Sequence, residues 1–368
     1  MSKLRNFSTW SNDLYTGARS YDIIGKRRRY YVASIAAVLL CVLVVILRGG
    51  FNLGIDFKGG VEFTVSGASS TSQEIGIDAV QSIIPEEVPR VANVGSSAVR
   101  IQTSSIDEDT QDKVQQALAD AYGVNLSEVS KSSIGPSWGS DVSGKALQGM
   151  IGFIILVSLV MVIYFRSWQL ATSAVISLLH DLAITAGVYA AVGWEITPAT
   201  VIGFLTIAAY SVYDKVVVFD KIRENTSEIL EQSRTTYAEQ SNLAVNQTLV
   251  RSINTSILGL LPVSSILFIG AFILGAGTLR DLALALFVGM AVGAYSSIFL
   301  APPLDATLRG LSAKYKAHER SVFALRERVA TSDAVTVDDL LLAGGADVHL
   351  VPGRHLGTGS QPRKRRKK

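Results

Sequence analysis

An aspartate lies inside a long apolar run, in the stretch SVYDKVVVFDKIREN at residues 211–225. Asp214 follows Pro198, where the run begins, by 16 residues, about 24 Å at the rise of a helix. A charged carboxylate at that depth in hydrocarbon costs several kcal/mol unless it is paired or hydrated. Burial favours its neutral form and a nearby cation favours its charged form, so we interpret Asp214 as a proton-exchange site. The alternative is that Asp214 lies in the hydrated headgroup region and not in the hydrocarbon.

The neighbouring residue, Lys215, lies about 100° further round the same helix and therefore need not pair with Asp214. We expect its long stem to carry the ammonium toward the headgroups. The alternative is that its charge keeps Asp214 ionised. Tyr210 and Ser211 lie one turn earlier and could face the same cavity.

A second acid occurs in the stretch SLLHDLAIT, where His180 and Asp181 lie about 11 residues into another apolar run, near its middle. A His–Asp pair at that depth is a second candidate member of a proton relay. A buried structural hydrogen bond explains the pair equally well.

Polar residues also mark the ends of these runs. Arg251, in the stretch NQTLVRSINTS, is either a signal of orientation or a partner of Asp214 that separates from it on protonation. Asp220 and Arg223 have the spacing of a weak surface ion pair. With Asn225 and Asn246 they form a predicted supporting set at the cytoplasmic edge.

Six apolar runs must position these groups, at residues 30–48, 147–165, 169–191, 198–219, 254–275 and 281–302. Each approaches the roughly 20 residues that cross a bilayer, and the mean hydropathy of the chain is +0.33. Gly289 and Gly293 predict a seam for close packing in the sixth run. Gly259 and Pro262 predict a bend in the fifth.

Lysines and arginines flank these runs on one side, which the positive-inside rule makes cytoplasmic. Both termini are then inside, and the first run, which no cleavage site follows, is a retained anchor. The predicted parts are a cytoplasmic N-terminus at 1–29, a first transmembrane helix at 30–48, an extracytoplasmic domain at 49–146, transmembrane helices two to six at 147–303 with a cytoplasmic loop at 220–253, and a cytoplasmic C-terminal region at 304–368.

The stretch 49–146 has the alternation of a small α+β domain. GGVEFTVSG, AVRIQT and SEVSKSSIGP predict strands, and two amphipathic helices separate them. Thr71 and Glu74 have the spacing of a capping box, and Gly123 is the expected stop of the second helix. This order indicates a split βαβ, ferredoxin-like sandwich. The predicted fold class is therefore an α-helical polytopic membrane protein with six transmembrane helices and a small α+β extracytoplasmic domain.

Composition excludes several classes. Six basic residues close the chain, and subtracting them from the net charge of +3 leaves −3, so no nucleic-acid-binding fold is indicated. Cys41 is the single cysteine, so the chain can form no internal disulfide. We expect no metal, no cofactor and no hydrolase chemistry, because no nucleophile–base pair appears in any run. The Gly-rich and basic tail from about residue 330 is expected to be disordered and solvated, or to touch anionic lipid or ribosomal RNA.

Several stretches together resemble the SecD/SecF export proteins: GIDFKGG, IGPSWG, LLHDLAIT, SVYDKVVVFDKIREN and NQTLVRSINTS. Their order, with six spans and one large outer domain, is similar to SecF in particular, over roughly residues 20–305. The signature positions are Gly54, Asp56, Gly59, Gly60, Pro136 and Gly139.

This resemblance implies a subunit of the bacterial cell membrane that works with a SecD-like protein beside the SecYEG channel. It would use the proton-motive force to draw exported polypeptides outward, as half of an RND-type transporter. The implied proton residues are Asp214 and Arg251. Relatives often have threonine where this chain has Lys215. Further expected partners are a YajC/YidC-type accessory and membrane lipid, with no specific nucleic acid. The alternatives are a non-energised scaffold and a stand-alone RND-type exporter.

Overall fold

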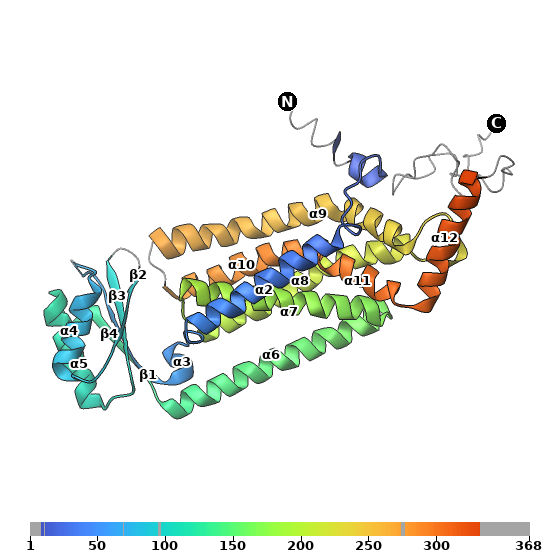
Figure 1. The fold of residues 1–368 in the computed structure, drawn as a ribbon. Helices are drawn as coiled ribbons and strands as arrows, with labels where there is room; N and C mark the ends of the chain where they lie inside the picture. The colour runs from blue at the N-terminus through green and yellow to red at the C-terminus, as the bar shows by residue number, and fades with distance from the viewer. Residues whose placement is uncertain (1–8, 11, 69, 95–96, 274–276, 332–368) are drawn as a thin grey trace, which may run out of the picture.

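A bundle of long helices carries a small α+β domain at one end (Figure 1). The computed structural model describes residues 9–10, 12–68, 70–94, 97–273 and 277–331. The basic tail lies outside these described residues. The bundle end that carries the α+β domain is called the domain end below, and the opposite end, where α12 lies, is called the terminal end (Figure 1).

Six helices are long and apolar enough to span a membrane, which confirms the predicted number. Two begin well before the apolar runs that they contain. Pro136 starts the second because proline suits the first helical position, and a capping box of Thr236 with Glu239 precedes the fifth. The helices are α2 (Arg27–Leu47), α6 (Pro136–Phe165), α7 (Trp168–Val192), α8 (Pro198–Asn225), α9 (Tyr237–Ser265) and α10 (Gly277–Phe299).

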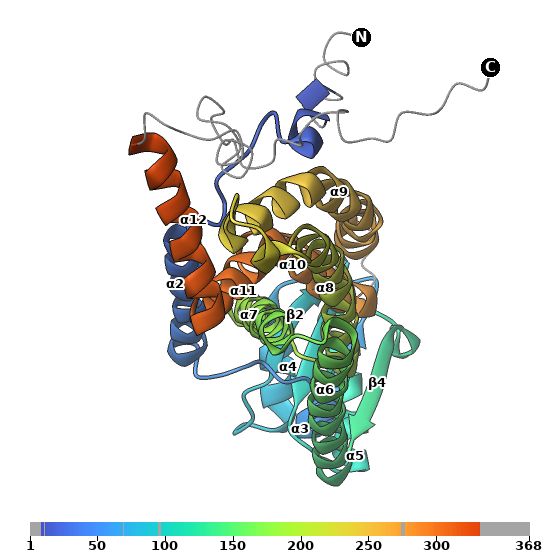
Figure 2. The same cartoon turned by 90° about the vertical axis from the view of Figure 1, so that its right-hand side faces the viewer.

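Helices α7, α8 and α10 form the centre of the bundle, and α2, α6 and α9 lie around them (Figure 2). Close to half of each apolar window is buried in these three, at 44%, 44% and 50%, against 6% in α2 and in α6. A Cβ atom on Gly289 would overlap Ile207, and one on Gly293 would lie 3.2 Å from Ser211. The predicted glycine seam of α10 is therefore confirmed as a place of close packing between α10 and α8.

The other helices of the bundle are less regular. Pro262 lies inside α9, four residues before the π-helical η3 (Ile266–Ile273). Proline removes one backbone donor, and a π-helical turn is one way in which a chain accommodates that loss. After α10 the chain continues as α11 (Ala301–Gly310) and α12 (Ala313–Thr331) at the terminal end.

The α+β domain is a four-stranded antiparallel sheet in the order β2-β3-β1-β4, with α4 and α5 packed on one face (Figure 1). Its core is made of apolar residues of the strands, α4 and α5, including Phe63, Ile101 and Leu118. The elements are β1 (Gly60–Val65), α4 (Gln73–Ile83), β2 (Arg90–Val94), β3 (Ala98–Thr103), α5 (Glu108–Tyr122) and β4 (Val129–Ile134). This is the predicted ferredoxin-like arrangement with one strand, β2, that the sequence analysis did not predict.

The two helix starts of this domain differ from each other. Ser72 precedes α4 and makes no capping hydrogen bond with its side chain, so the predicted Thr71–Glu74 capping box is wrong. By contrast, Asp107 caps α5 by accepting from the backbone N–H of Thr110 at 3.0 Å. Helix α5 ends at Gly123 with a φ of +67°, as predicted.

The family-signature residues lie where the domain joins the bundle. The short helix α3 (Ile55–Lys58) is followed by Gly59 and Gly60, whose φ angles of +75° and +135° favour glycine. A Cβ atom on Gly139 of α6 would lie 2.8 Å from the backbone N of Gly59. Gly54 donates its N–H to the carbonyl of Ile196 at 3.0 Å. These glycines allow backbone to pack on backbone, which fixes β1 to the bundle.

Candidate functional site in the helical bundle

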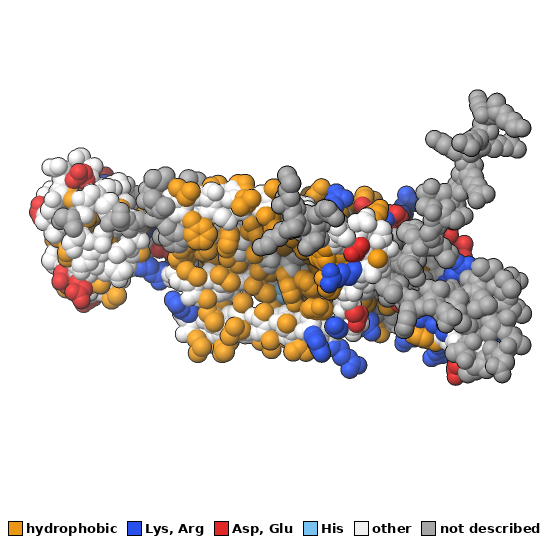
Figure 3. Space-filling view, turned by 90° about the horizontal axis from the view of Figure 1, so that it is seen from above, with side chains coloured by type: hydrophobic (Ala, Val, Ile, Leu, Met, Phe, Trp, Pro, Cys, Tyr) orange, Lys and Arg blue, Asp and Glu red, His pale blue; other side chains and the backbone are white. Residues whose placement is uncertain are grey.

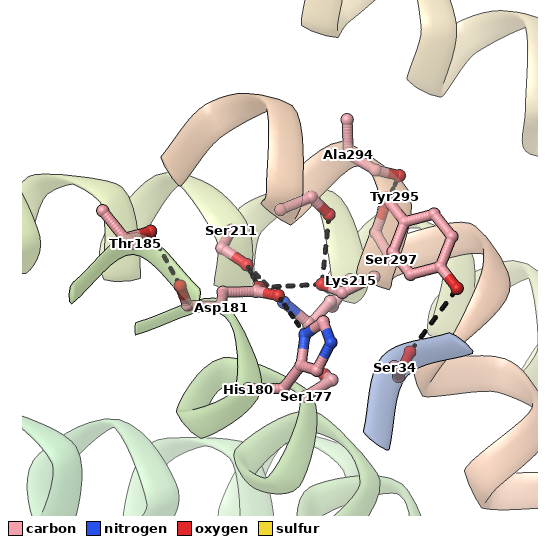
Figure 4. A network of polar contacts seen from close by, with 12 residues as sticks. Ser34, Ser177, His180, Asp181, Thr185, Ser211, Lys215, Ala294, Tyr295 and Ser297 are labelled. Carbon is pink, nitrogen blue, oxygen red and sulfur yellow. Dashed lines mark hydrogen bonds and ion pairs between the residues drawn. The ribbon is translucent and has the colours of Figure 1, made fainter. Parts of the chain in front are cut away.

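A fully buried carboxylate lies at the centre of the bundle (Figure 4). Asp181 of α7 receives three hydrogen bonds on Oδ2: from Ser211 Oγ at 2.6 Å, Lys215 Nζ at 2.7 Å and Ser296 Oγ at 2.7 Å. Its Oδ1 lies 3.1 Å from Nδ1 of His180. Helices α7, α8 and α10 thus all supply groups to one carboxylate, which hydrogen bonds satisfy in place of water.

The position of Lys215 corrects the expectation that it reaches the headgroups. Its side chain is 0% exposed, and its ammonium pairs with Asp181 and also donates to Ser211. The 100° turn from Asp214 directs Lys215 toward the interior of the bundle. A buried ammonium there needs an anion close by, and Asp181 provides it.

The second acid, Asp214, lies close to this network. It is 4% exposed, and its Oδ2 makes a short hydrogen bond with Ser297 Oγ of α10. The neighbouring Ser296 contacts Asp181, so two adjacent serines of α10 each contact one of the two acids. The structure therefore brings together Asp181, Asp214 and His180, which the sequence predicted separately.

Sequence reasoning did not identify Ser296 and Ser297 as members of the site. A signal was present in the seam, because Gly293 precedes Ser297 by four residues and packs against α8. Residues one turn apart share a helix face, so the seam points these hydroxyl groups at α7 and α8. Small hydroxyl residues that continue a glycine seam are therefore candidates for polar contacts inside a bundle.

His180 lies at the edge of the network nearest α2. Its ring centroid is 6.4 Å from that of Tyr295, whose hydroxyl lies 3.4 Å from Ser34 Oγ of α2 (Figure 4). The Nε2 atom of His180 is buried and has no hydrogen-bond partner among the described residues. An imidazole with one unpaired nitrogen can accept or donate a proton there.

Arg251 does not join the network in this structure. Its side chain is exposed on α9, and within the described ranges no hydrogen bond or ion pair links it to Asp214. Tyr210, one turn before Asp214, donates instead to the carbonyl of Thr255 at 3.1 Å and so joins α8 to α9. Of the two alternatives for Arg251, the contact with Asp214 is therefore not seen among the described residues.

The supporting residues at the terminal end make structural contacts. Asp220 and Arg223 do not pair with each other in the described part of the chain, which corrects that prediction. Asp220 accepts from the Tyr164 hydroxyl at 2.8 Å, and Arg223 reaches the Tyr164 carbonyl at 3.5 Å. Asn225 donates to Gln247 of α9 at 3.0 Å. These residues hold α6, α8 and α9 together.

Asn246 and its neighbour Asn242 hold the start of the chain. Asn246 accepts from the Tyr21 N–H at 2.7 Å and donates to the Tyr21 carbonyl at 2.9 Å. Asn242 accepts from the Ile23 N–H at 2.8 Å. The segment before α2 is thereby fixed to α9, a role that the sequence analysis did not foresee for Asn246.

The groups in this arrangement are ones that can accept and donate protons. The arrangement contains two carboxyl groups, an imidazole, an ammonium and hydroxyl groups within a largely buried interior. No group of three His, Cys, Asp or Glu side chains in the described residues is arranged to hold a metal ion. The hydroxyl groups can accept one proton while they donate another, and so link neighbouring acids.

Comparison with known proteins decides the family. The family model of the protein export membrane protein SecD/SecF, C-terminal, matches residues 113–310, and the SecD/SecF GG motif matches residues 44–67. Protein translocase subunit SecF of Streptomyces coelicolor is 41% identical over 90% of this chain and 87% of its own length. The chain belongs to the SecF family.

Other SecF relatives agree over a shorter part. Protein translocase subunit SecF of Rhodothermus marinus is 33% identical over 80% of this chain and 95% of its own length. The crystal structure of SecDF from Thermus thermophilus, described as a translocon-associated membrane protein, matches with a TM-score of 0.71 at 29% identity. That match covers 80% of this chain and 39% of SecDF. The chain is thus a SecF-family, multi-pass membrane protein.

Proposed function

We propose that this chain is the SecF subunit of a Sec translocase that couples the proton-motive force to late export of polypeptides. It acts with a SecD-like protein beside a SecYEG channel, in a bacterial cell membrane. The observation that carries the proposal is the pair of buried acids, Asp181 and Asp214. Each of them is hydrogen-bonded to one of two adjacent serines of the central helix α10. Ionisable groups inside a membrane bundle are expensive and typically mark ion or proton paths.

The orientation follows from charge. Lys and Arg side chains gather at the terminal end of the apolar band, with fewer at the domain end (Figure 3). The basic stretch 26–29 lies at the start of α2, which begins at the terminal end (Figure 1). The positive-inside rule then makes the terminal end cytoplasmic and the α+β domain extracytoplasmic. The exposed apolar side chains of α2 and α6 lie in lipid or against the partner subunit.

The available energy is sufficient for coupling. One elementary charge that crosses 100 mV yields about 2.3 kcal/mol. A factor of ten in an equilibrium needs about 1.4 kcal/mol. Protonation and release at Asp214 would alter its contact with Ser297, where α8 meets α10. Repacking of these helices moves the joint at Gly59 and Gly139, and the α+β domain moves with it.

The test is gradient-dependent completion of export in inverted membrane vesicles, with the native chain and Asp214→Asn. Asparagine keeps the size and much of the hydrogen bonding but cannot titrate. We expect the gradient-dependent part to vanish while the complex still assembles. Asp78→Asn makes the same change on the exposed face of α4 and should leave export unchanged.

A non-energised scaffold is the competing function. If Asp214→Asn exports as the native chain does, the buried acids are structural and the scaffold interpretation replaces the motor. If no SecD-like chain co-purifies with the native protein, a stand-alone exporter is favoured instead.

A further inference from the structure

The two buried acids differ in the donors that surround them. Asp181 faces an ammonium, two hydroxyl groups and an imidazole nitrogen, all between 2.6 and 3.1 Å. A carboxylate with this many donors is in the ionised form, because an ionised carboxylate is purely an acceptor. The charge of Lys215 offsets that of Asp181.

Asp214 has a different environment. Within the described residues it forms no ion pair, and its hydrogen bond is with Ser297 Oγ. Ser297 Oγ also lies 3.0 Å from the carbonyl of Ala294, three residues before it on α10. A hydroxyl has one hydrogen, and helical serines commonly donate it to a carbonyl of the preceding turn. When Ser297 donates to Ala294, the contact with Asp214 requires a proton on the carboxyl group.

Charge balance leads to the same assignment. Asp181 and Lys215 cancel, so a proton on Asp214 leaves the buried network neutral, whereas an ionised Asp214 is an uncompensated charge. Titratable and charged groups on the helices packed around Asp214 include His180 and Asp181 of α7, Tyr210 and Lys215 of α8, Arg251 of α9, Tyr295 of α10, the Tyr164–Asp220 contact of α6 and α8, and the Asp305–Arg309 pair of α11. Of the cations in this set, Lys215 is held by Asp181, Arg309 by Asp305, and Arg251 is exposed.

We propose that Lys215 is a positioning residue that holds Asp181 as a fixed anion, so that Asp214 alone carries the exchanging proton. This inference rests on the proposed function, in which a proton is exchanged in the bundle. In the release step the O–H bond of the Asp214 carboxyl group breaks and its proton passes to water. Lys215 keeps its proton, Asp181 stays ionised, and the Ser297 hydroxyl turns from Ala294 to donate to the new carboxylate.

Lys215 therefore limits the site to one exchanging carboxyl group. An apolar residue at this position would leave Asp181 without its cation, and desolvation would then favour a proton on Asp181 as well. The number of protons bound by the two acids is thus expected to change from one to two when Lys215 is replaced.

The test is infrared absorption of protonated carboxyl groups in the purified full chain in lipid, across a pH titration. Of the two acids in the network, one should be protonated in the native chain, giving a band that Asp214→Asn removes and Asp181→Asn leaves in place. Lys215→Met should show two, and Lys215→Met with Asp214→Asn should show one. Lys215→Arg, which keeps the cation, should show one, as should Lys221→Met, a change of charge near the end of the same helix.

Two results would overturn the proposal. In the first, Asp181→Asn removes the native band and Asp214→Asn does not. In the second, Lys215→Met still shows a single band that disappears with Asp214→Asn. Lys215→Gln keeps a hydrogen-bond donor without the charge and replaces Lys215→Met if the latter fails to fold. If neither neutral variant folds, the native chain with the two asparagine variants still decides which acid holds the proton.

The readout needs no partner, channel or substrate. If the infrared bands are as expected but the native chain shows no gradient-dependent export, the proposed function is rejected and this assignment stands. Gradient-dependent export with two protonated acids in the native chain would do the reverse.

Discussion

The α+β domain and the helical bundle sort their side chains in opposite ways. In the domain, Phe63 and Ile101 are 0% exposed, while the acids of the first turn of α5 face water. In the bundle, Asp181 and Lys215 are 0% exposed, while Leu39 of α2 is 62% exposed. Each region places at its surface the groups that its solvent accepts. A buried charge costs free energy in either region, and in the bundle the buried charges mark the candidate functional site.

The two regions also differ in what holds them together. Water drives the apolar core of the domain to close. Lipid gives no such drive between helices, so the bundle depends on close packing at Gly289 and Gly293 and on hydrogen bonds such as that between Ser296 and Asp181. Changes that enlarge or remove side chains should therefore act differently in the two regions.

The largest effect is expected from Phe63→Ala in the domain. Loss of a fully buried phenylalanine costs about 3–5 kcal/mol, because a cavity replaces apolar contacts. Hydrogen exchange on the full chain should show loss of protection in β1, β3 and α5, with the centre of the bundle unchanged. Val88→Ala, at a side chain 84% exposed, is the control and should change stability by less than about 0.5 kcal/mol. Equal loss of protection in α7 and α8 would contradict the prediction that the bundle keeps its packing when the core of the domain is disrupted.

An intermediate effect is expected where the regions meet. Gly139→Ala would place a Cβ atom 2.8 Å from the Gly59 backbone and 3.0 Å from that of Phe57, and backbone cannot easily give way. We expect a loss of about 1–3 kcal/mol in unfolding free energy, as for other overpacked sites. Gly144→Ala, with nothing within 4 Å of its Cβ, should instead stabilise α6 by up to about 1 kcal/mol. Thermal unfolding of both variants tests this, and a Gly139→Ala variant as stable as the native chain would show that the joint is loose.

The smallest effect concerns pH, and its sign differs between two acids outside the bundle. Burial, and then the charge of Glu62, raise the pKa of Asp56 at the joint. The folded chain then holds this proton more tightly than the unfolded chain does. The contribution of Asp56 to stability is present below the ordinary carboxyl pKa and is lost as the pH rises through the raised value.

Asp107 should behave in the opposite way. The side-chain and backbone hydrogen bonds from Thr110 lower the pKa of Asp107. Its contribution is present above the ordinary value and is lost as the pH falls through the lowered one. Thermal unfolding across the acidic range, with Asp56→Asn and Asp107→Asn, separates the two. If the difference in Tm between the native chain and the variant changes with pH in the same direction for Asp56→Asn and for Asp107→Asn, this assignment is wrong.

Sequence periodicity and hydropathy were sufficient to predict the helices that face lipid and the strands that have one face in the core and one in water. Six apolar runs predicted six helices, and the sequence pattern predicted β1, β3 and β4. The strand β2 was missed because RVANV is short and has exposed Arg90 and Asn93, so its place in the sheet depends on pairing with β3. A strand of this kind is fixed by its neighbour and not by its own pattern.

The site was predictable only in part for the same reason. The expected depth in the membrane was enough to identify Asp214, Asp181 and His180. A charge in hydrocarbon is costly whichever helix it faces, so no knowledge of the neighbouring helices was needed. The partner of Lys215 depends on which helix lies beside α8, and one sequence does not state that. The hydroxyl groups of Ser296 and Ser297 became meaningful once α10 was seen to pack on α7 and α8.

The contact of Asn242 with Ile23 has a consequence for the timing of synthesis. The two residues are 219 positions apart in the chain. At 5–20 residues per second, a ribosome needs about 11–44 s to make the stretch that separates them. Throughout that time the amino-terminal segment waits without its final partner while the first helices enter the bilayer. A helix made later in synthesis, α9, therefore secures a segment made near its start.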